Sequence, residues 1–172
     1  PVWKLPIPYQ VYINEIALVF LYGRPVKWTQ QSTGTDRAFQ KFQDVIEHTH
    51  FNSKLRQCKR IAGSETESAM VFRDANDAPD VQIRVLAKSK GDEIYTRWDQ
   101  YENLISVAWG YYVREQENSL VYHFDIYTPN IIYRCTRKSI GWEVVEETNF
   151  IGKIPIILFQ QDKEWKGVEP LI

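Results

Sequence analysis

The spacing of apolar residues divides the chain into a helical first part and a β-rich second part. Up to about residue 69 the apolar residues recur at the period of a helix, and from residue 70 onwards they alternate with polar residues, as in half-buried strands. The alternating segments are short and are separated by turn residues, which favours an antiparallel meander. We therefore predict an α+β fold, with two to three N-terminal helices followed by a mostly antiparallel meander β-sheet.

The first predicted helix runs from Asn14 to Tyr22. Asn14 can cap its start, whereas Gly23 and Pro25 favour its termination. Apolar residues cover so much of this segment that we expect the helix to be buried on most sides. The proline-rich stretch over residues 1–12 is expected to be extended, because proline disfavours helical backbone.

Two further helices are predicted after a possible short strand over Val26–Thr29. The second helix starts at Thr35, and its apolar stripe extends to Thr49 at helical spacing. The third helix starts at Asn52 or Ser53, either of which can cap it. Its apolar side consists of Leu55, Cys58, Ile61 and Ala62.

The β part contains eight strand candidates bounded by turn residues. They are Met70–Arg73, Val81–Ala87, Glu93–Trp98, Ile105–Arg114, Leu120–Tyr127, Ile131–Arg137, Trp142–Glu147 and Ile154–Gln160. We expect the last five to form one meander. The whole chain is predicted to be a single α+β domain, mainly helical over residues 1–69, mainly β over 70–160, and starting a following helix over 161–172.

Composition and charge narrow the functional classes. The formal net charge of −1 disfavours tight nucleic-acid binding, because such binding requires clustered cations, although a conduit through which DNA slides remains compatible. Two cysteines do not form the framework of a secreted disulfide scaffold. The longest apolar run, Ile16–Tyr22, is too short to span a bilayer, so no membrane partner is expected. Because the sequence starts at Pro1 and stops at Ile172 without a polar tail, we interpret it as a fragment.

The histidines and cysteines are the candidate residues for a metal site or a catalytic nucleophile, but their spacing along the chain does not match the motifs of such sites. His48 and His50 are two residues apart and cannot share a helix face, and Cys58 would supply only a third zinc ligand. Cys58 or Cys135 could pair with His123, yet neither thiol lies in a motif that lowers its pKa. We predict no catalytic residues, no metal site and no cofactor.

The charged clusters also favour ordinary surfaces. Glu143 and Glu147 share one side of a predicted strand and Glu146 lies on the other, which fits a solvated face better than an acid/base pair. The basic residues of the third helix are expected to form a solvated face or a partner contact: they are Lys54, Arg56, Lys59 and Arg60. No Gly-rich phosphate-binding motif occurs.

Four segments, in order, resemble the portal proteins of tailed bacteriophages, of the siphophage type. Asn14–Val26, NEIALVFLYGRPV, resembles the family's helix followed by an aromatic-Gly-basic-Pro-Val turn, and Thr35–Ala62 resembles its helix pair. Asn103–Tyr112, with the aromatic strands through Tyr133, resembles its Tyr-rich run. Asn149–Leu171, NFIGKIPIILFQQDKEWKGVEPL, resembles the family's N-x-x-G-x-(I/V)-P-(I/V) strand, polar turn and helix start.

The resemblance implies an N-terminal, wing-like fragment of a ring subunit, usually dodecameric, at one capsid vertex. Its implied partners are further copies of the chain, terminase, capsid or scaffold proteins, head–tail connector proteins and double-stranded DNA passing through the channel. The implied location is the virion, with the host bacterial cytoplasm during assembly. Such a subunit is structural and not an enzyme.

Two other readings of the residues remain open. A β-rich binding module could use exposed Trp98, Trp109, Trp142 or Trp165, because aromatic side chains on a sheet face can bind carbohydrate or peptide. A small hydrolase is the third hypothesis, but no spacing of nucleophile and base supports it.

Overall fold

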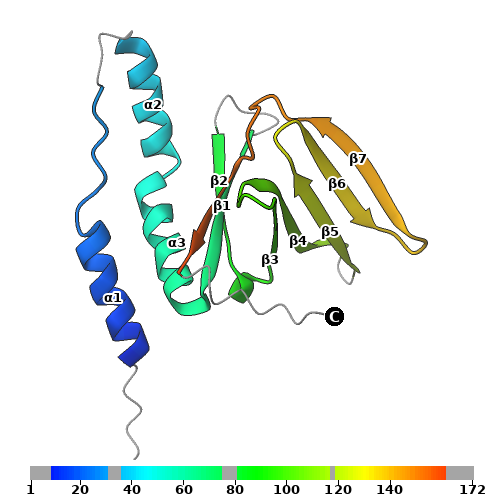
Figure 1. Ribbon diagram of the computed structural model, residues 1–172, viewed down its shortest axis with the longest axis horizontal. Helices are drawn as coiled ribbons and strands as arrows, with labels where there is room; N and C mark the ends of the chain where they lie inside the picture. Colours follow the sequence, from blue (N-terminus) through cyan, green and yellow to red (C-terminus); the bar gives the residue numbers. More distant parts are fainter. Residues whose placement is uncertain (1–8, 31–35, 75–80, 117–118, 162–172) are drawn as a thin grey trace, which may run out of the picture.

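The computed structural model describes residues 9–30, 36–74, 81–116 and 119–161. In these ranges three helices precede eight strands, which confirms the predicted α+β class (Figure 1). The helices are α1 (Tyr9–Tyr22), α2 (Asp36–His48) and α3 (Phe51–Glu65). The strands are β1 (Glu67–Asp74), β2 (Val81–Leu86), β3 (Glu93–Trp98), β4 (Leu104–Gln116), β5 (Ser119–Tyr127), β6 (Ile131–Arg137), β7 (Trp142–Thr148) and β8 (Ile156–Gln160), with a short 3-10 helix over Lys88–Lys90.

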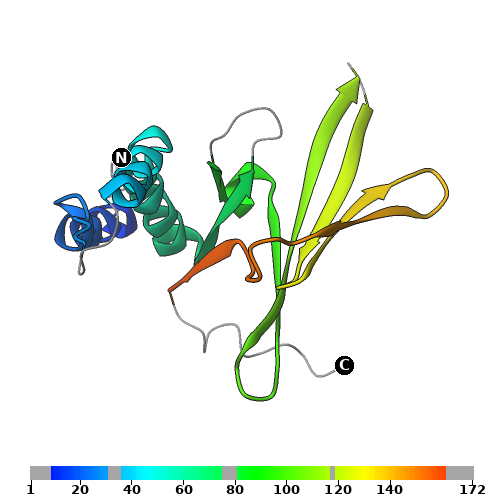
Figure 2. The same ribbon diagram turned by 90° about the horizontal axis from the view of Figure 1, so that it is seen from above.

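The strands form two antiparallel sheets. The three-stranded sheet has the order β2-β1-β8, and the five-stranded sheet is the meander β3-β4-β5-β6-β7. Figure 2 shows the helices at one end of the molecule and the β6–β7 hairpin at the other.

Side chains of β1 alternate between two hydrophobic clusters, and this alternation fixes the order of the layers. Ala69 and Val71 contribute to the cluster that also contains Trp109 of the five-stranded sheet. Met70 instead contributes to the cluster with Cys58 of α3. Because successive residues of a strand point to opposite faces, the three-stranded sheet lies between α3 and the five-stranded sheet.

Helix α1 packs on the outer side of α3 through a mostly polar contact. Leu18 is its one buried residue, and the Asn14 amide Nδ2 donates a 2.8 Å hydrogen bond to the carbonyl oxygen of Arg60. Glu15 forms a 2.6 Å ion pair with the Arg60 guanidinium. Gly63 permits the close approach, because a Cβ there would overlap the Asn14 amide. The layers therefore run α1, α3, three-stranded sheet, five-stranded sheet.

Several predictions for the helical part were wrong. Helix α1 starts at Tyr9, inside the stretch predicted to be extended, and it is exposed on most sides instead of buried. Its apolar residues were assigned to the core because sequence pattern does not distinguish a core face from an uncovered one. Val26–Thr29 forms no strand.

The predicted start of the third helix was also wrong. Helix α3 starts at Phe51, and its N-cap is His50 in the left-handed region (φ 51°), without a side-chain cap. The sharp turn between α2 and α3 is stabilised by backbone bonds, from Thr49 N to Val45 O and from His50 N to Glu47 O, both 3.0 Å. A side-chain cap at residue 52 or 53 is therefore not needed to start the helix.

The last strand does not extend the meander as predicted. Strand β8 starts at Ile156, two residues later than expected, and pairs with β1 in the other sheet. Asn149 redirects the chain after β7, because its Nδ2 donates 2.8 Å bonds to the carbonyl oxygens of Thr128 and Lys153. Burial of Ile156 beside Val71 then favours the new position. The other predicted strands are confirmed, with small shifts of their ends.

The assignment of residues 1–172 to a single domain stays a prediction. Four predicted features lie outside the described residues. They are the extended start over residues 1–8, the first residue of the second helix (Thr35), the turn that the sequence indicates over Asp74–Asp80, apart from Asp74, and the helix over 161–172, apart from Gln161.

Candidate interaction surfaces

The thiol of Cys58 is buried and does not meet the histidines proposed as its zinc partners. Its side chain is fully buried between α3 and β1, with Sγ 3.8 Å from the carbonyl oxygen of Ala69. Burial raises the pKa of the Cys58 thiol to about 11, which keeps the thiol protonated and unreactive. His48 and His50 are exposed at the α2–α3 turn. Among the residues that the structure describes, no group of three His, Cys, Asp or Glu could hold a metal ion.

His123 and Cys135 lie on opposite faces of the five-stranded sheet. His123 is paired with Thr136, and its Nδ1 is 3.3 Å from the Thr136 hydroxyl, whereas Cys135 is paired with Phe124. Directly paired residues share a face and neighbours along a strand do not, so the thiol and the imidazole point apart. Burial also raises the pKa of the Cys135 thiol. The pair cannot act as nucleophile and base.

The glutamates of β7 form ion pairs with neighbouring cations. Glu143 lies 3.2 Å from Lys138, and Glu147 lies 3.2 Å from the Nε of Arg134. Every residue of β7 is exposed. These carboxylates fit the predicted solvated face.

Sequence reasoning missed a buried polar cluster on the inner face of the five-stranded sheet. The Asp125 carboxylate accepts a 2.6 Å hydrogen bond from Nη1 of Arg134 and a 3.2 Å bond from the Tyr111 hydroxyl. The same Nη1 donates 2.9 Å to the Tyr127 oxygen. Burial, followed by the Asp125 charge, raises the pKa of Tyr111 to about 12. Alternation marks Asp125 and Arg134 as facing the same side as their apolar neighbours, and this is the signal that could have found the cluster.

This cluster lines a cavity of about 680 Å³ between the two sheets and the turn after β7. The carboxylate is paired with a guanidinium, and the tyrosines hold their protons. The arrangement therefore ties β4, β5 and β6 together and leaves no group poised to transfer a proton.

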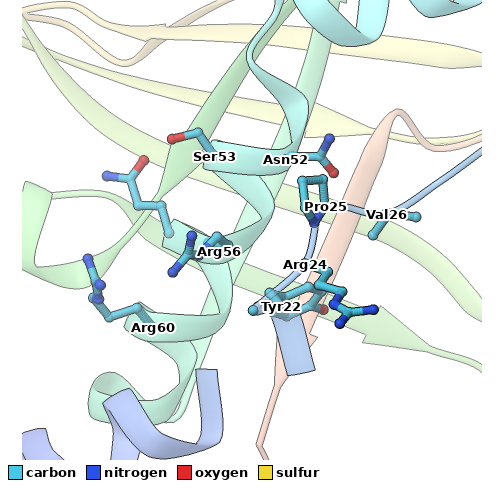
Figure 3. A pocket seen from close by; sticks show the side chains of 10 residues that line it. Tyr22, Arg24, Pro25, Val26, Asn52, Ser53, Arg56 and Arg60 are labelled. Carbon is cyan, nitrogen blue, oxygen red and sulfur yellow. The ribbon is translucent and has the colours of Figure 1, made fainter. Parts of the chain in front are cut away.

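The predicted basic run does not form one continuous face. Lys54 turns toward β2 and donates 2.6 Å to the carbonyl oxygen of Ile83, and Arg60 is paired with Glu15 of α1. Arg56 and Arg60 line a 690 Å³ cavity with Arg24 from the segment after α1. Figure 3 shows the α3 arginines on one side of this cavity and Arg24 and Pro25 on the other.

The outward face of α1 carries a stripe of six large apolar side chains, called here the α1 stripe. They are Tyr9, Tyr12, Ile13, Ile16, Val19 and Phe20, whose exposed fractions range from 39% to 86%. Their spacing of three and four residues places them on one side of the helix. Asn14 and Glu15 face α3 instead. Apart from the buried Leu18, the side of α1 that contacts α3 is therefore polar, and most of the large apolar side chains face outward.

The outer face of the five-stranded sheet carries a second uncovered apolar surface, called here the aromatic face. The strand registers place these side chains on the side opposite to Trp109: Tyr95, Tyr112, Leu120, Tyr122, Phe124, Trp142 and Val144. Ring contacts join neighbours across the strands, with centroids 4.9 Å apart for Tyr112 and Tyr122 and 6.0 Å for Tyr122 and Trp142. Within the described residues no layer covers this face.

The tryptophans proposed for a binding module are not equivalent. Trp109 is buried at 1% exposure in the core between the sheets, so it cannot contact a ligand. Trp142 is half-exposed on the aromatic face, and Trp98 is partly exposed at the end of β3. Trp165 lies outside the described residues.

Comparison with known proteins gives one clear result. A family model described as "phage portal protein, SPP1 Gp6-like" matches residues 3–172. No curated protein matches the chain. None of the helices in the described ranges has the length and apolar character needed to cross a membrane.

Proposed function

Because the chain belongs to the SPP1 Gp6-like family of phage portal proteins, we propose that it is a structural subunit of the portal ring at a capsid vertex. The observation that carries this proposal is the family match, which extends over nearly the whole chain. Portal proteins of this family form capsid-associated oligomeric rings and are structural, not catalytic. We assign the chain to the wing of the subunit.

The chemistry of the described residues supports a structural role. The cysteine thiols are buried, His123 and Cys135 point apart, and the buried carboxylate of Asp125 is neutralised by Arg134. Two large apolar surfaces are left uncovered by the residues that the structure describes, and such surfaces mark sites of contact with other proteins.

The finer functions in the proposal are head assembly, docking of the terminase during DNA packaging, passage of DNA and joining of head to tail. The partners are further copies of the chain, terminase, capsid or scaffold proteins and head–tail connector proteins. The net charge of −1 is compatible with DNA sliding through a channel, because the 21 Lys and Arg residues are balanced by 22 Asp and Glu residues and give no excess of cations to hold phosphates. The subunit assembles in the host bacterial cytoplasm and ends in the virion.

Electron microscopy of the purified full-length protein tests the proposal directly. Closed rings viewed along their axis are the expected result. A protein that stays monomeric at all concentrations would contradict it. In a phage, removal of the gene should yield heads without packaged DNA.

A further inference from the structure

The two uncovered apolar surfaces lie on the first and the last layer of the molecule. The α1 stripe faces away from α3, and the aromatic face points away from the three-stranded sheet. Figure 2 places α1 and the β6–β7 hairpin at opposite ends. One chain therefore cannot bring its own stripe onto its own aromatic face.

We infer that the α1 stripe of one subunit docks on the aromatic face of the next copy of the same chain. This inference rests on the proposed ring function and names the surfaces through which neighbours meet. Contacts between two different surfaces of identical chains are heterologous, and they form closed rings when the rotation between neighbours closes. Surfaces at opposite ends of a layered molecule provide this head-to-tail geometry.

The exposed area agrees with a permanent contact. Aromatic side chains bury about 150–250 Å² each when they are covered, and Tyr9, Tyr12 and Phe20 are 64%, 65% and 86% exposed. These three residues alone offer on the order of 400 Å², whereas monomers rarely expose contiguous apolar patches above a few hundred Å². Ile13, Ile16 and Val19 bring the stripe toward the roughly 800 Å² per partner of a stable interface.

The polar inner side of α1 excludes the simplest alternative, in which the helix turns its stripe toward its own chain. Asn14 and Glu15 are bound to Arg60, and the Asn14 amide occupies the space beside Gly63 that a Cβ would need. A rotation of α1 would break these bonds and leave the stripe against the polar residues of α3. The contacts of Asn14 and Glu15 with Arg60 therefore stabilise the orientation of α1 in which its apolar stripe faces outward.

The chemistry of the two surfaces is complementary. Both surfaces are rich in tyrosine, which is enriched at interfaces because it combines apolar area with a hydroxyl. The stripe carries no charged side chain, and the one carboxylate among the tyrosines of the aromatic face, Glu93, accepts hydrogen bonds from the hydroxyls of Tyr122 (2.6 Å) and Tyr95 (3.2 Å). Cations and carboxylates lie at the margin of the aromatic face, where Arg137 packs 5.4 Å above the Trp142 ring. A mainly aromatic centre with charged side chains at its rim is typical of protein–protein contacts.

Cysteine cross-linking in the full-length protein tests the contact. The double variant Phe20→Cys/Tyr112→Cys should form a ladder of disulfide-linked oligomers on non-reducing gels, since both positions are exposed and lie on the two surfaces. The matched control Lys41→Cys/Tyr112→Cys replaces an exposed residue of α2 and should give no ladder. Phe20→Cys alone should not give dimers, and such dimers would indicate a two-fold contact between helices and overturn the inference.

A disruptive variant separates this inference from the ring proposal. Phe20→Asp should weaken assembly by about tenfold or more, measured by analytical ultracentrifugation, with an unchanged circular dichroism spectrum because the side chain is exposed. Lys41→Asp should leave assembly unchanged. If Phe20→Asp assembles normally and the ladder is absent, the inference fails while the ring proposal stands. If the unsubstituted protein forms no rings, the ring proposal itself fails.

Discussion

The indole of Trp109 donates a 3.0 Å hydrogen bond from Nε1 to the buried carboxylate of Asp92. The same carboxylate accepts a 3.0 Å bond from Arg84 of the three-stranded sheet and a 3.2 Å bond from the backbone N–H of Ala87. Arg84 also packs over the Trp109 ring, 4.6 Å from its centroid. Asp92 therefore joins the two sheets at the point where the chain passes from one to the other.

Replacement of Asp92 should destabilise the protein strongly. Asp92→Ala leaves the Trp109 indole N–H without its buried acceptor and Arg84 without its partner, so the free energy of unfolding should fall by about 2–3 kcal/mol. Urea unfolding followed by tryptophan fluorescence measures the loss. Asp44→Ala, at an exposed position of α2, should change stability by no more than about 0.5 kcal/mol. Equal effects of the two substitutions would contradict the proposed link.

The Asp125–Arg134 pair should contribute far more than the surface pair on the same sheet. Asp125→Ala removes the buried partner of the Arg134 guanidinium and leaves it only the exposed Glu147, so it should cost about 2–4 kcal/mol. Glu143→Ala removes an exposed pair with Lys138 and should cost about 0.5 kcal/mol or less. The double variant Asp125→Ala/Arg134→Met should recover part of the loss, because no partly buried cation then remains without its buried carboxylate, and the freed Glu147 is exposed. Chemical unfolding at constant ionic strength compares the three proteins.

Packing of α1 on α3 should depend on Gly63. Gly63→Ala would raise helix propensity by about 1 kcal/mol, yet the new Cβ overlaps the Asn14 amide and should displace α1. We expect faster chymotrypsin cleavage in α1, at the tyrosines of the α1 stripe. The second variant Asn14→Ala/Gly63→Ala removes the clashing amide and should slow cleavage relative to Gly63→Ala alone. Unchanged cleavage in Gly63→Ala would show that the two helices are not matched at this position.

Alkaline pH should destabilise the inner face of the five-stranded sheet. Burial, then Asp125, raises the pKa of Tyr111 from 10.0 to about 12, so the folded protein holds this proton more tightly than the unfolded chain. The resulting stability is fully present below about pH 10 and is lost as the pH rises from 10 to 12. Thermal melts at pH 8 to 11.5 should show a shallower decline for Tyr111→Phe than for the unsubstituted protein. Parallel declines would exclude Tyr111 as a cause.

The sequence predicts the strands well because their pattern is local. Alternation from Val81 onwards and the turn residues between segments locate β2 to β7, with ends that shift by a few residues. The partner of β8 cannot be obtained in this way, because β1 lies at the opposite end of the β part of the chain. The left-handed N-cap at His50 could not be predicted from the sequence either, since histidine has no strong capping preference.

The candidate surfaces were only partly predictable. The apolar character of α1 could be predicted from the sequence, but its exposure could not. A helix with an exposed apolar face and a helix of the core can have the same amino-acid composition. The polar contact between Asn14 and Arg60 depends on two helices whose relative position no local pattern fixes. The basic run was predicted as a solvated face or partner contact, and the backbone bond of Lys54 removes one member from that face.

The pairing of β8 with β1 has a consequence for biosynthesis. When β1 leaves the ribosome, the backbone groups along one of its edges have no strand partner until β8 has been synthesised. Strand β8 is the last strand of the described chain to be translated. Until then Ala69 and Val71 lie on a strand with unpaired backbone groups, a template for wrong association between nascent chains. A second nascent chain or a chaperone on the polysome would bind this unpaired edge of β1. The edge is covered once β8, which ends at Gln160, has left the ribosome and paired with β1.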